Sequence, residues 1–234
     1  MKFLKFFHHF LIINQMISTG LKKLDKFLLG GIHSGVITDI YGANGTGKTQ
    51  LLLQICINSI KNGENVLFLD TTGGFRPERI LEMKSDQNSD STFLEKITVL
   101  RITNTFEQIK SLEIISSKNF SLVVIDNITD LFSYEYPGDD AIFQKNTIFM
   151  KFMHQLSLIS INKKISVIVS NMIRHVDGKE IENMKSAIDP FTHIKIKLSR
   201  NSSNFKGQIN WLSKENIFSY AITKYGLVNN TEDI

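Results

Sequence analysis

The chain has 234 residues, 42% of them hydrophobic, which is enough for one large domain or two small ones with a substantial core. Its 27 basic and 23 acidic residues give a net charge of +4, which mildly favours an anionic partner. The single cysteine excludes an intramolecular disulfide framework, the three prolines argue against long disordered linkers, and no run of about eighteen apolar residues predicts a membrane span.

The first residues differ from the rest of the chain. Residues 1–13 read MKFLKFFHHFLII, with two lysines before a short apolar run, and they superficially resemble a signal peptide. No small-residue cleavage site follows, and a core-like pattern begins almost at once. We therefore divide the chain into a leader of doubtful role, residues 1–16, and one core domain, residues 17–234, and we expect a cytoplasmic location.

The first part of the core alternates apolar runs with amphipathic ones. A short helix is expected to begin at Ser18 or Thr19 as its cap and to end before Gly30. Fully apolar runs predict buried strands, and runs with helical periodicity predict helices, one of them capped by Thr105. Strands are expected at 36–41, 66–70, 97–102, 122–126 and 165–171, and helices at 48–62, 78–83, 105–115 and 141–160.

The last third follows another pattern. Residues 127–140 are expected to be irregular, residues 172–191 read as a long polar insertion, and three short strands follow at 193–198, 207–212 and 217–222. Alternating strands and helices followed by strands alone predict an α/β fold. We expect a mostly parallel central sheet flanked by helices, with a C-terminal antiparallel extension.

One stretch carries a chemical signature. Residues 42–49 read GANGTGKT and fit the pattern G-x-x-x-x-G-K-[ST], between a predicted strand and a predicted helix. Glycines let successive backbone N–H groups face one anion, and the helix N-terminus favours negative charge. Lys48 supplies a charge for the β- and γ-phosphates, and Thr49 supplies a hydroxyl for Mg²⁺. The expected nucleotide-binding residues are Gly42, Ala43, Asn44, Gly45, Thr46, Gly47, Lys48, Thr49 and Gln50.

A carboxylate on another strand completes this predicted site. Asp126 ends the apolar strand 122–126, where it can reach the Mg²⁺ shell beside Thr49. The alternatives without nucleotide binding are a glycine-rich turn before a helix, for residues 42–49, and a plain strand-ending aspartate, for Asp126. The six histidines show no metal-ligand spacing, and no Cys/His or Ser/His/Asp arrangement can be assembled.

Several short motifs lie along the core. They are STG at 18–20, LD at 24–25, GGI at 30–32, GKTQ at 47–50, FRPER at 75–79, VIDN at 124–127, SN at 170–171, YAIT at 220–223 and GL at 226–227. Together they resemble the RecA/RadA recombinase superfamily over about residues 17–227, most closely the short archaeal RadB-like paralogues that consist of the ATPase core only. The resemblance implies a RecA-like P-loop core that binds ATP with Mg²⁺ and serves homologous recombination and DNA repair. We expect no helical N-terminal domain of the kind found in full recombinases, because the segment before Ile17 is too short for one.

Two departures from the family pattern bear on catalysis. Active recombinases carry Asp-Thr-Glu-Gly-Thr where this chain has DTTGG at 70–74, so Thr72 replaces the Glu that polarises the attacking water. Met172 stands where the family has a Gln that senses the γ-phosphate. We therefore expect ATP binding with slow hydrolysis. Asp70 or Glu78 can be considered as substitute bases, although structural roles suit both better.

In the family, two loops bind single-stranded DNA. The first corresponds to about residues 131–142, which hold acids but no Lys or Arg, and the second to about 172–190, where acids outnumber bases. A basic surplus lies later, where Lys195 and Lys197 alternate with apolar residues so that one strand face is expected to be positive. A solvated strand face is an equal alternative. The candidate DNA-binding residues are Arg174, Lys195, Lys197 and Arg200.

The expected function is that of an ATP-binding recombinase paralogue with a weak DNA-associated ATPase. The expected partners are single-stranded DNA and either a recombinase or further copies of the same chain, with no membrane. Three alternatives remain: a true DNA-dependent strand-exchange ATPase, a non-hydrolysing adaptor that binds a recombinase, and a KaiC-like signalling ATPase of the same superfamily.

Overall fold

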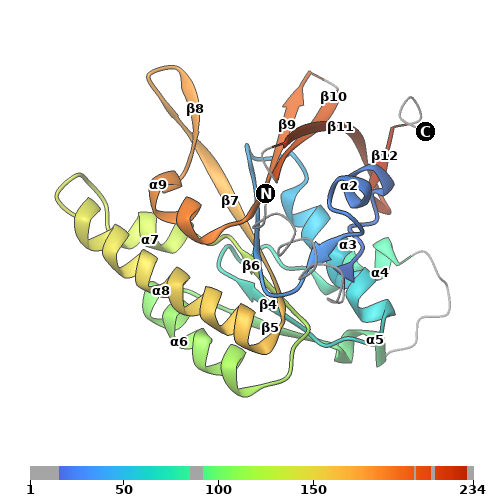
Figure 1. Cartoon of the computed structure of the whole chain (residues 1–234), viewed down its shortest axis with the longest axis horizontal. Helices are drawn as coiled ribbons and strands as arrows, with labels where there is room; N and C mark the ends of the chain where they lie inside the picture. Colours follow the sequence, from blue (N-terminus) through green and yellow to red (C-terminus); the bar gives the residue numbers. More distant parts are fainter. Residues whose placement is uncertain (1–15, 85–91, 203, 212–213, 231–234) are drawn as a thin grey trace, which may run out of the picture.

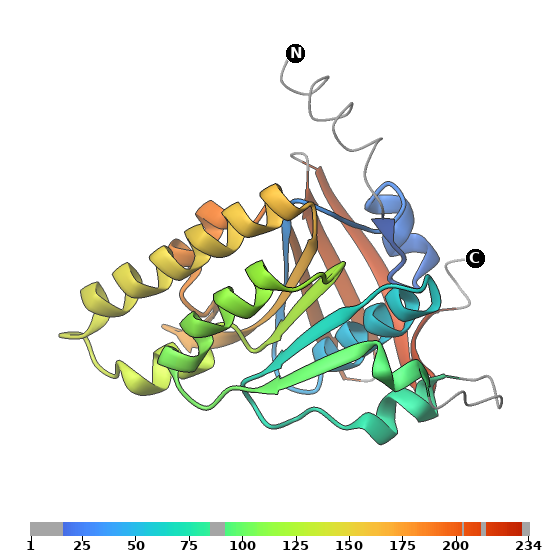
Figure 2. The same cartoon turned by 90° about the horizontal axis from the view of Figure 1, so that it is seen from below.

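The computed structural model describes residues 16–84, 92–202, 204–211 and 214–230, in which a large central sheet has helices on both faces (Figures 1 and 2). Residues 1–15 of the predicted leader lie outside the described residues. Met16, which we assigned to the leader, pairs with His33 in a separate two-stranded sheet. That small sheet consists of β1 (Met16–Ile17) and β2 (Ile32–His33).

Parallel strands form the centre of the large sheet. They are β3 (Ile37–Gly42), β4 (Val66–Asp70), β5 (Ile97–Arg101), β6 (Leu122–Asp126), β7 (Ser166–Val176) and β9 (Ile194–Asn201). Their spatial order is β5-β4-β6-β7-β3-β9, and each neighbouring pair is parallel. Because helices cover both faces, the central strands β4 and β6 are buried throughout and apolar up to their final aspartate. The predicted parallel centre is confirmed.

The sheet continues beyond β9 in antiparallel fashion. Its further strands are β10 (Asn204–Trp211), β11 (Lys214–Thr223) and β12 (Gly226–Asn229), paired in that order. The C-terminal antiparallel extension is therefore confirmed, with strands longer than predicted. The sequence analysis missed β12, because it is only four residues long and follows β11 after a tight turn.

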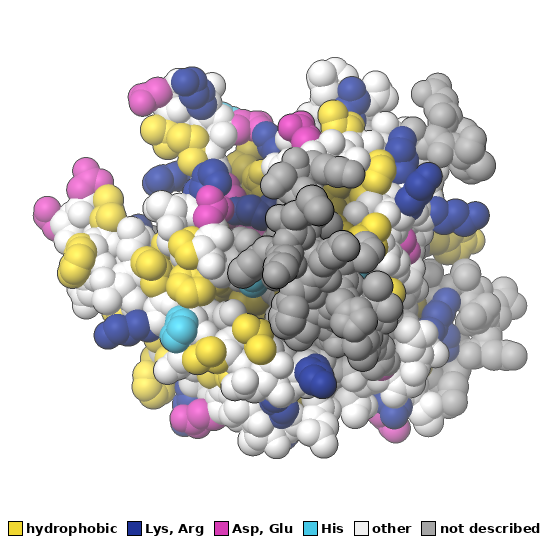
Figure 3. Space-filling model, viewed as in Figure 1, with side chains coloured by type: hydrophobic (Ala, Val, Ile, Leu, Met, Phe, Trp, Pro, Cys, Tyr) yellow, Lys and Arg dark blue, Asp and Glu magenta, His cyan; other side chains and the backbone are white. Residues whose placement is uncertain are grey.

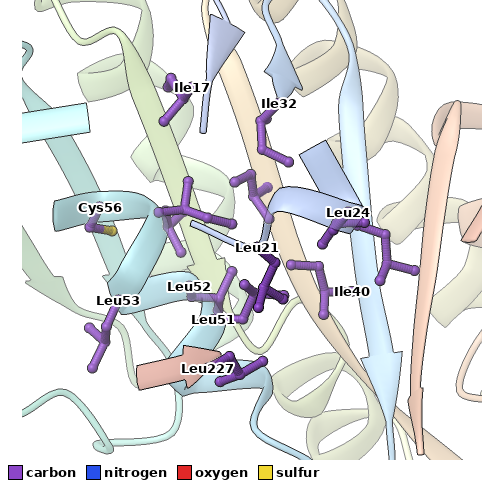
Figure 4. Packing of buried hydrophobic residues seen from close by; sticks show 14 of the residues in the cluster. Ile17, Leu21, Leu24, Ile32, Ile40, Leu51, Leu52, Leu53, Cys56 and Leu227 are labelled. Carbon is purple, nitrogen blue, oxygen red and sulfur yellow. The ribbon is translucent and has the colours of Figure 1, made fainter. Parts of the chain in front are cut away.

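Side chains of the strands alternate between two cores, one on each face of the sheet. Phe68 and Val124 face one core, whereas Leu67 and Val123 face the other. Figure 4 shows part of the first core, where leucines of the helix after β3 pack against Ile17, Leu21, Leu24, Ile40 and Leu227. The first core is covered by α2 (Lys22–Phe27), α3 (Lys48–Lys61) and α4 (Pro77–Met83), and the second by α6 (Thr105–Ser117), α7 (Asp130–Glu135) and α8 (Ile142–Lys163).

Two helices begin differently from the predictions. Helix α2 starts at Lys22 without a side-chain cap, and Thr19 instead hydrogen-bonds the carboxylate of Asp25, its Oγ1 donating at 2.6 Å. Helix α6 is capped by Asn104, not by Thr105, and the Asn104 Oδ1 accepts a hydrogen bond from the Glu107 N–H at 2.8 Å. Asn is the stronger N-cap residue because its short side chain reaches the free N–H groups of the first turn readily.

Two segments expected to lack regular structure are ordered. Residues 127–140 contain α7, and the polar insertion 172–191 begins as the continuation of β7, which forms a hairpin through Asp177 and Gly178. Both turn residues have positive φ, of 49° and 72°, as a type I′ turn requires. The rest of the insertion is β8 (Lys179–Glu182), α9 (Lys185–Ile188) and the 3-10 turn η1 (Asp189–Phe191). The short helix α5 (Thr92–Glu95) was also not predicted.

None of the helices in the described ranges combines the length and the apolar character needed to cross a bilayer. Cys56, the single cysteine, is a buried core residue of α3.

Candidate nucleotide-binding site

The P-loop connects β3 to α3 at the carboxyl edge of the parallel strands, and two of its glycines are needed for its shape. A Cβ atom on Gly42 would lie 2.1 Å from the Leu198 carbonyl oxygen, so a glycine lets β9 pass close to the loop. Gly47 is the N-cap of α3 with a φ of 92°, in the left-handed region. The loop thus curls directly into the helix N-terminus, where backbone N–H groups are free to bind an anion.

The loop borders a cleft with a volume of about 400 Å³. Gly42, Ala43 and Thr46 are not among the residues that line the cleft, and the Thr46 hydroxyl donates to the Ala43 carbonyl at 2.8 Å. The hydroxyl of Tyr220, on β11, donates to the Thr46 carbonyl at 2.6 Å and so holds the loop against the antiparallel extension. The lining residues are Asn44, Gly45, Gly47, Lys48, Thr49, Gln50, Thr72, Asp126, Asn127, Asp130, Met172 and Ile222.

The Lys48 ammonium is held within the loop. It donates to the carbonyl oxygens of Gly42 and Ala43, each at 2.9 Å. Burial lowers the pKa of Lys48, while the negative charges of Asp126 and Asp130 act in the opposite direction. The lysine therefore sits on the cleft wall close to carboxylates, where a bound phosphate would compete with the two carbonyl acceptors.

Thr49 and Asp126 meet as the sequence predicted. The Thr49 hydroxyl donates to Asp126 Oδ2 at 2.7 Å, and the Ser170 hydroxyl donates to Oδ1 of the same carboxylate. Burial raises the pKa of Asp126, and the hydrogen bonds from Ser170 and Thr49 oppose that shift. An adjacent hydroxyl and carboxylate form the hard oxygen set that Mg²⁺ prefers, so these two residues fit the ion. The described ranges hold no group of three His, Cys, Asp or Glu side chains that could form another metal site.

The loop after β4 places Thr72 on the cleft wall. Asp70 does not face the cleft, because its Oδ1 accepts backbone N–H groups from Thr72, Gly73 and Gly74 at 3.1, 2.8 and 3.1 Å. Glu78 is exposed in the first turn of α4 and does not line the cleft. The two acids considered as substitute bases are therefore occupied or remote.

The sequence analysis missed four residues of the site, one of them Asn127, which lines the cleft beside Asp126. Asp130 lines the cleft from the first position of α7, a helix that we did not predict. Ile222 reaches the cleft from β11, and no local signal reveals that contact. Arg79 orients Gln50, since its Nε and Nη2 donate to Gln50 Oε1 at 2.9 and 2.8 Å. The FRPER motif contains this arginine, so its partner could have been sought in the P-loop helix.

The candidate DNA-binding lysines are balanced by acids of the hairpin β7–β8 and of η1. Lys195 donates to Glu182 Oε2 at 2.5 Å and to Asp189, lies 3.4 Å from Asp39 Oδ2, and has a side chain only 14% exposed. Lys197 forms a 2.9 Å ion pair with Glu180. The expectation of a positive strand face is therefore wrong for these two residues. Figure 3 shows basic and acidic side chains intermixed over β8.

The two arginine candidates are exposed. Arg200 lies over the Phe205 ring, 5.5 Å from its centre, and donates to the Ser202 carbonyl at 2.8 Å. Arg174 lines a second cavity of about 570 Å³ between β7, β8, α9 and the start of α8, together with Lys145 and Lys185. The structure thus brings Arg174 together with two lysines that the sequence analysis did not select.

A P-loop at the carboxyl edge of a parallel sheet, with its threonine bonded to a strand-ending aspartate, defines a nucleotide-binding protein with a RecA-like core. The Rad51 family model matches residues 12–195, and the chain belongs to the Rad51 family. It is 37% identical over 177 residues to the DNA repair and recombination protein RadB of Thermococcus onnurineus, covering 73% of this chain and 74% of the relative.

Other relatives agree with this assignment. RadB of Thermococcus sibiricus is 34% identical over 169 residues, covering 70% of this chain and 71% of the relative. The DNA repair and recombination protein RadA of Cenarchaeum symbiosum is 32% identical over 169 residues, covering 68% of this chain. The alignment spans only 42% of that RadA, and 53% of the RadA of Aeropyrum pernix.

Proposed function

We propose that this chain is an ATP-binding recombinase paralogue that acts in homologous recombination and DNA repair, with a slow ATPase. The observation that carries the proposal is the 2.7 Å contact of Thr49 with Asp126 beside Lys48, within a cleft of about 400 Å³. Membership of the Rad51 family supports it, as do the names of the RadA and RadB relatives.

In this proposal, the P-loop binds the phosphates of ATP. Backbone N–H groups from Asn44 onward and at the N-terminus of α3 donate hydrogen bonds to the phosphate oxygens, and Lys48 releases its carbonyl partners to contact the β- and γ-phosphates. Thr49 and Asp126 hold Mg²⁺, whose charge neutralises the phosphate oxygens when it is bound. Arg79 fixes Gln50 at the cleft wall.

A buried polar network connects the cleft with the hairpin β7–β8. Asn127 lines the cleft, and its Oδ1 accepts the Thr129 N–H at 2.9 Å. The Thr129 hydroxyl donates to Asn171 Oδ1 at 2.7 Å, and Asn171 Nδ2 donates to Glu182 Oε1 at 3.0 Å. We propose that nucleotide binding shifts this network and so changes how the hairpin is presented to single-stranded DNA or to a recombinase.

A second candidate function is that of a non-hydrolysing adaptor. It is favoured by the cleft itself, where Thr72 offers no carboxylate and Met172 offers no amide to a γ-phosphate. In that case ATP has a structural role, and the partner is a recombinase protomer or another copy of this chain.

The two candidates differ in turnover. We would measure ATP hydrolysis and the anisotropy of labelled single-stranded DNA, with ATP, with ADP and without nucleotide, each with and without an added RadA recombinase. Nucleotide-dependent DNA binding with hydrolysis stimulated by DNA is the expected result. ATP binding without turnover, together with binding to the recombinase, identifies the adaptor. A protein that binds no nucleotide contradicts both.

A further inference from the structure

The proposed function leaves one chemical question open. Hydrolysis of ATP by water is assisted by a group that orients the water and accepts its proton. Thr72 cannot accept a proton near neutral pH, and Asp70 is occupied by backbone N–H groups of its own loop. Asp126 is bonded to Thr49 and Ser170. Among the described residues that line the cleft, Asp130 supplies the one further carboxylate.

Asp130 has the surroundings of a proton acceptor. It follows Asp126 closely in the chain and lines the same cleft, and among the described residues no hydrogen bond or ion pair engages its carboxylate. Its side chain is half-buried. Burial and the charge of Asp126 raise the pKa of Asp130, and Lys48 lowers it, which gives a carboxylate with more affinity for a proton than an exposed one.

We infer that Asp130 is the general base for the slow ATP hydrolysis of this chain, in place of the carboxylate that Thr72 lacks. This inference rests on the proposed function. The water oxygen forms a bond to the γ-phosphorus, and the bond from that phosphorus to the β–γ bridging oxygen breaks, with its electron pair leaving on ADP. The proton of the water passes to the Asp130 carboxylate and from there to solvent. ADP and inorganic phosphate are the products.

Single-turnover hydrolysis of saturating Mg·ATP tests this role. Asp130→Asn keeps the shape of the side chain and removes its basicity, so the rate should fall at least about tenfold, since general-base assistance is typically worth about 10² to 10⁴. ATP affinity should stay the same or increase, because a negative charge beside the phosphates is removed. Asp140→Asn, at an exposed acid outside the cleft, is the matched control and should leave the rate unchanged.

Rescue separates a chemical role from a structural one. Formate should raise the rate of Asp130→Ala by supplying a carboxylate to the vacated space, and it should not affect Asp140→Ala. Adding Thr72→Glu to Asp130→Asn should also restore hydrolysis, because residue 72 lines the same cleft. If Asp130→Asn does not fold, the formate experiment on Asp130→Ala decides, and a rate that formate does not raise overturns the inference.

The remaining outcomes distinguish this inference from the proposed function. A parent protein that binds ATP without hydrolysing it, or an Asp130→Asn variant with the parental rate at equal ATP occupancy, overturns the role of Asp130 and leaves nucleotide binding intact. A parent protein that binds no ATP overturns the proposed function and the inference together.

Discussion

Asp126 and Lys195 illustrate how the surroundings of a charged residue decide what it does in this protein. Asp126 ends a buried strand, where two hydroxyl groups hold its carboxylate at the cleft. Lys195 lies on a strand whose alternating pattern suggests a charged surface, yet carboxylates from β3, β8 and η1 enclose its ammonium. Asp126 is therefore placed to bind a cation, whereas Lys195 stabilises the fold through its ion pairs.

At the residue scale, Thr72→Glu should raise ATP turnover about tenfold, which corresponds to about 1.4 kcal/mol of barrier. A carboxylate at this cleft position adds a second acceptor for the proton of the attacking water. Adding Met172→Gln should increase the gain further, because the amide can hydrogen-bond the γ-phosphate. Single-turnover hydrolysis at equal ATP occupancy measures both effects, and unchanged rates would show that residue 72 does not limit the reaction.

Lys195→Met should destabilise the protein by about 3–5 kcal/mol, because it leaves the buried carboxylate of Glu182 without its cation. Lys197→Met, on the same strand, is the matched control. Its ion pair with Glu180 is solvent-exposed, and the loss should be at most about 1 kcal/mol. Urea unfolding at pH 7 measures the free energy of unfolding of each variant. Equal stability of the two variants would show that the Lys195 cluster contributes no more than a surface pair.

The pH dependence of stability should reveal Asp39. Burial, and then the charge of Glu182, raise the pKa of Asp39 well above its ordinary value of 3.8. The folded protein therefore binds a proton that the unfolded chain has released, so this group makes stability fall as pH rises from about 4 through the raised pKa. Asp39→Asn keeps the neutral form at every pH and should flatten that decline. A parallel decline in parent and variant, in urea unfolding across the pH series, would contradict the assignment.

At the scale of elements, the sequence predicted those strands and helices whose formation depends on neighbouring residues in the chain. The short apolar runs of β4 and β6 predict strands of a covered sheet, and the P-loop needs its flanking strand and helix. The hairpin β7–β8 was missed because its polar residues read as a loop, although Asp177-Gly178 is a turn signal. Neither the ion cluster of Lys195 nor the place of Asp130 in the cleft could be predicted, since both depend on elements distant in sequence.

The basic residues of β7 and β9 lead to a prediction about DNA. If single-stranded DNA binds over these two strands, the exposed candidates Arg174 and Arg200, together with Lys197, should bind its phosphates. Replacing these three by Ala should weaken binding and flatten its salt dependence by about 0.7–1 unit of log-log slope for each phosphate that is no longer neutralised. Lys110→Ala on α6 is the control. A triple variant that binds as the parent does at two salt concentrations would show that this surface does not bind DNA.

At the scale of the whole molecule, the site depends on parts of the chain far from the P-loop. Gln54 of α3 donates to the Thr19 carbonyl at 2.9 Å and to the Leu227 carbonyl at 3.1 Å, so it ties the P-loop helix to both ends of the described core. Tyr220 supports the loop from the antiparallel extension. We propose that residues 17–234 act as one domain in which this extension buttresses the nucleotide site.

Binding of Mg·ATP to the parent protein and to Lys48→Ala, measured by isothermal titration calorimetry, tests the central claim most directly. Lys48 lines the cleft, and its removal takes away the positive charge assigned to the β- and γ-phosphates. Its partners are two backbone carbonyls of the loop, so the fold should survive, as a thermal melt can verify. The account predicts saturable binding to one site in the parent and a loss of at least about tenfold in affinity, about 1.4 kcal/mol, in the variant. Equal affinity of a folded Lys48→Ala protein would contradict it.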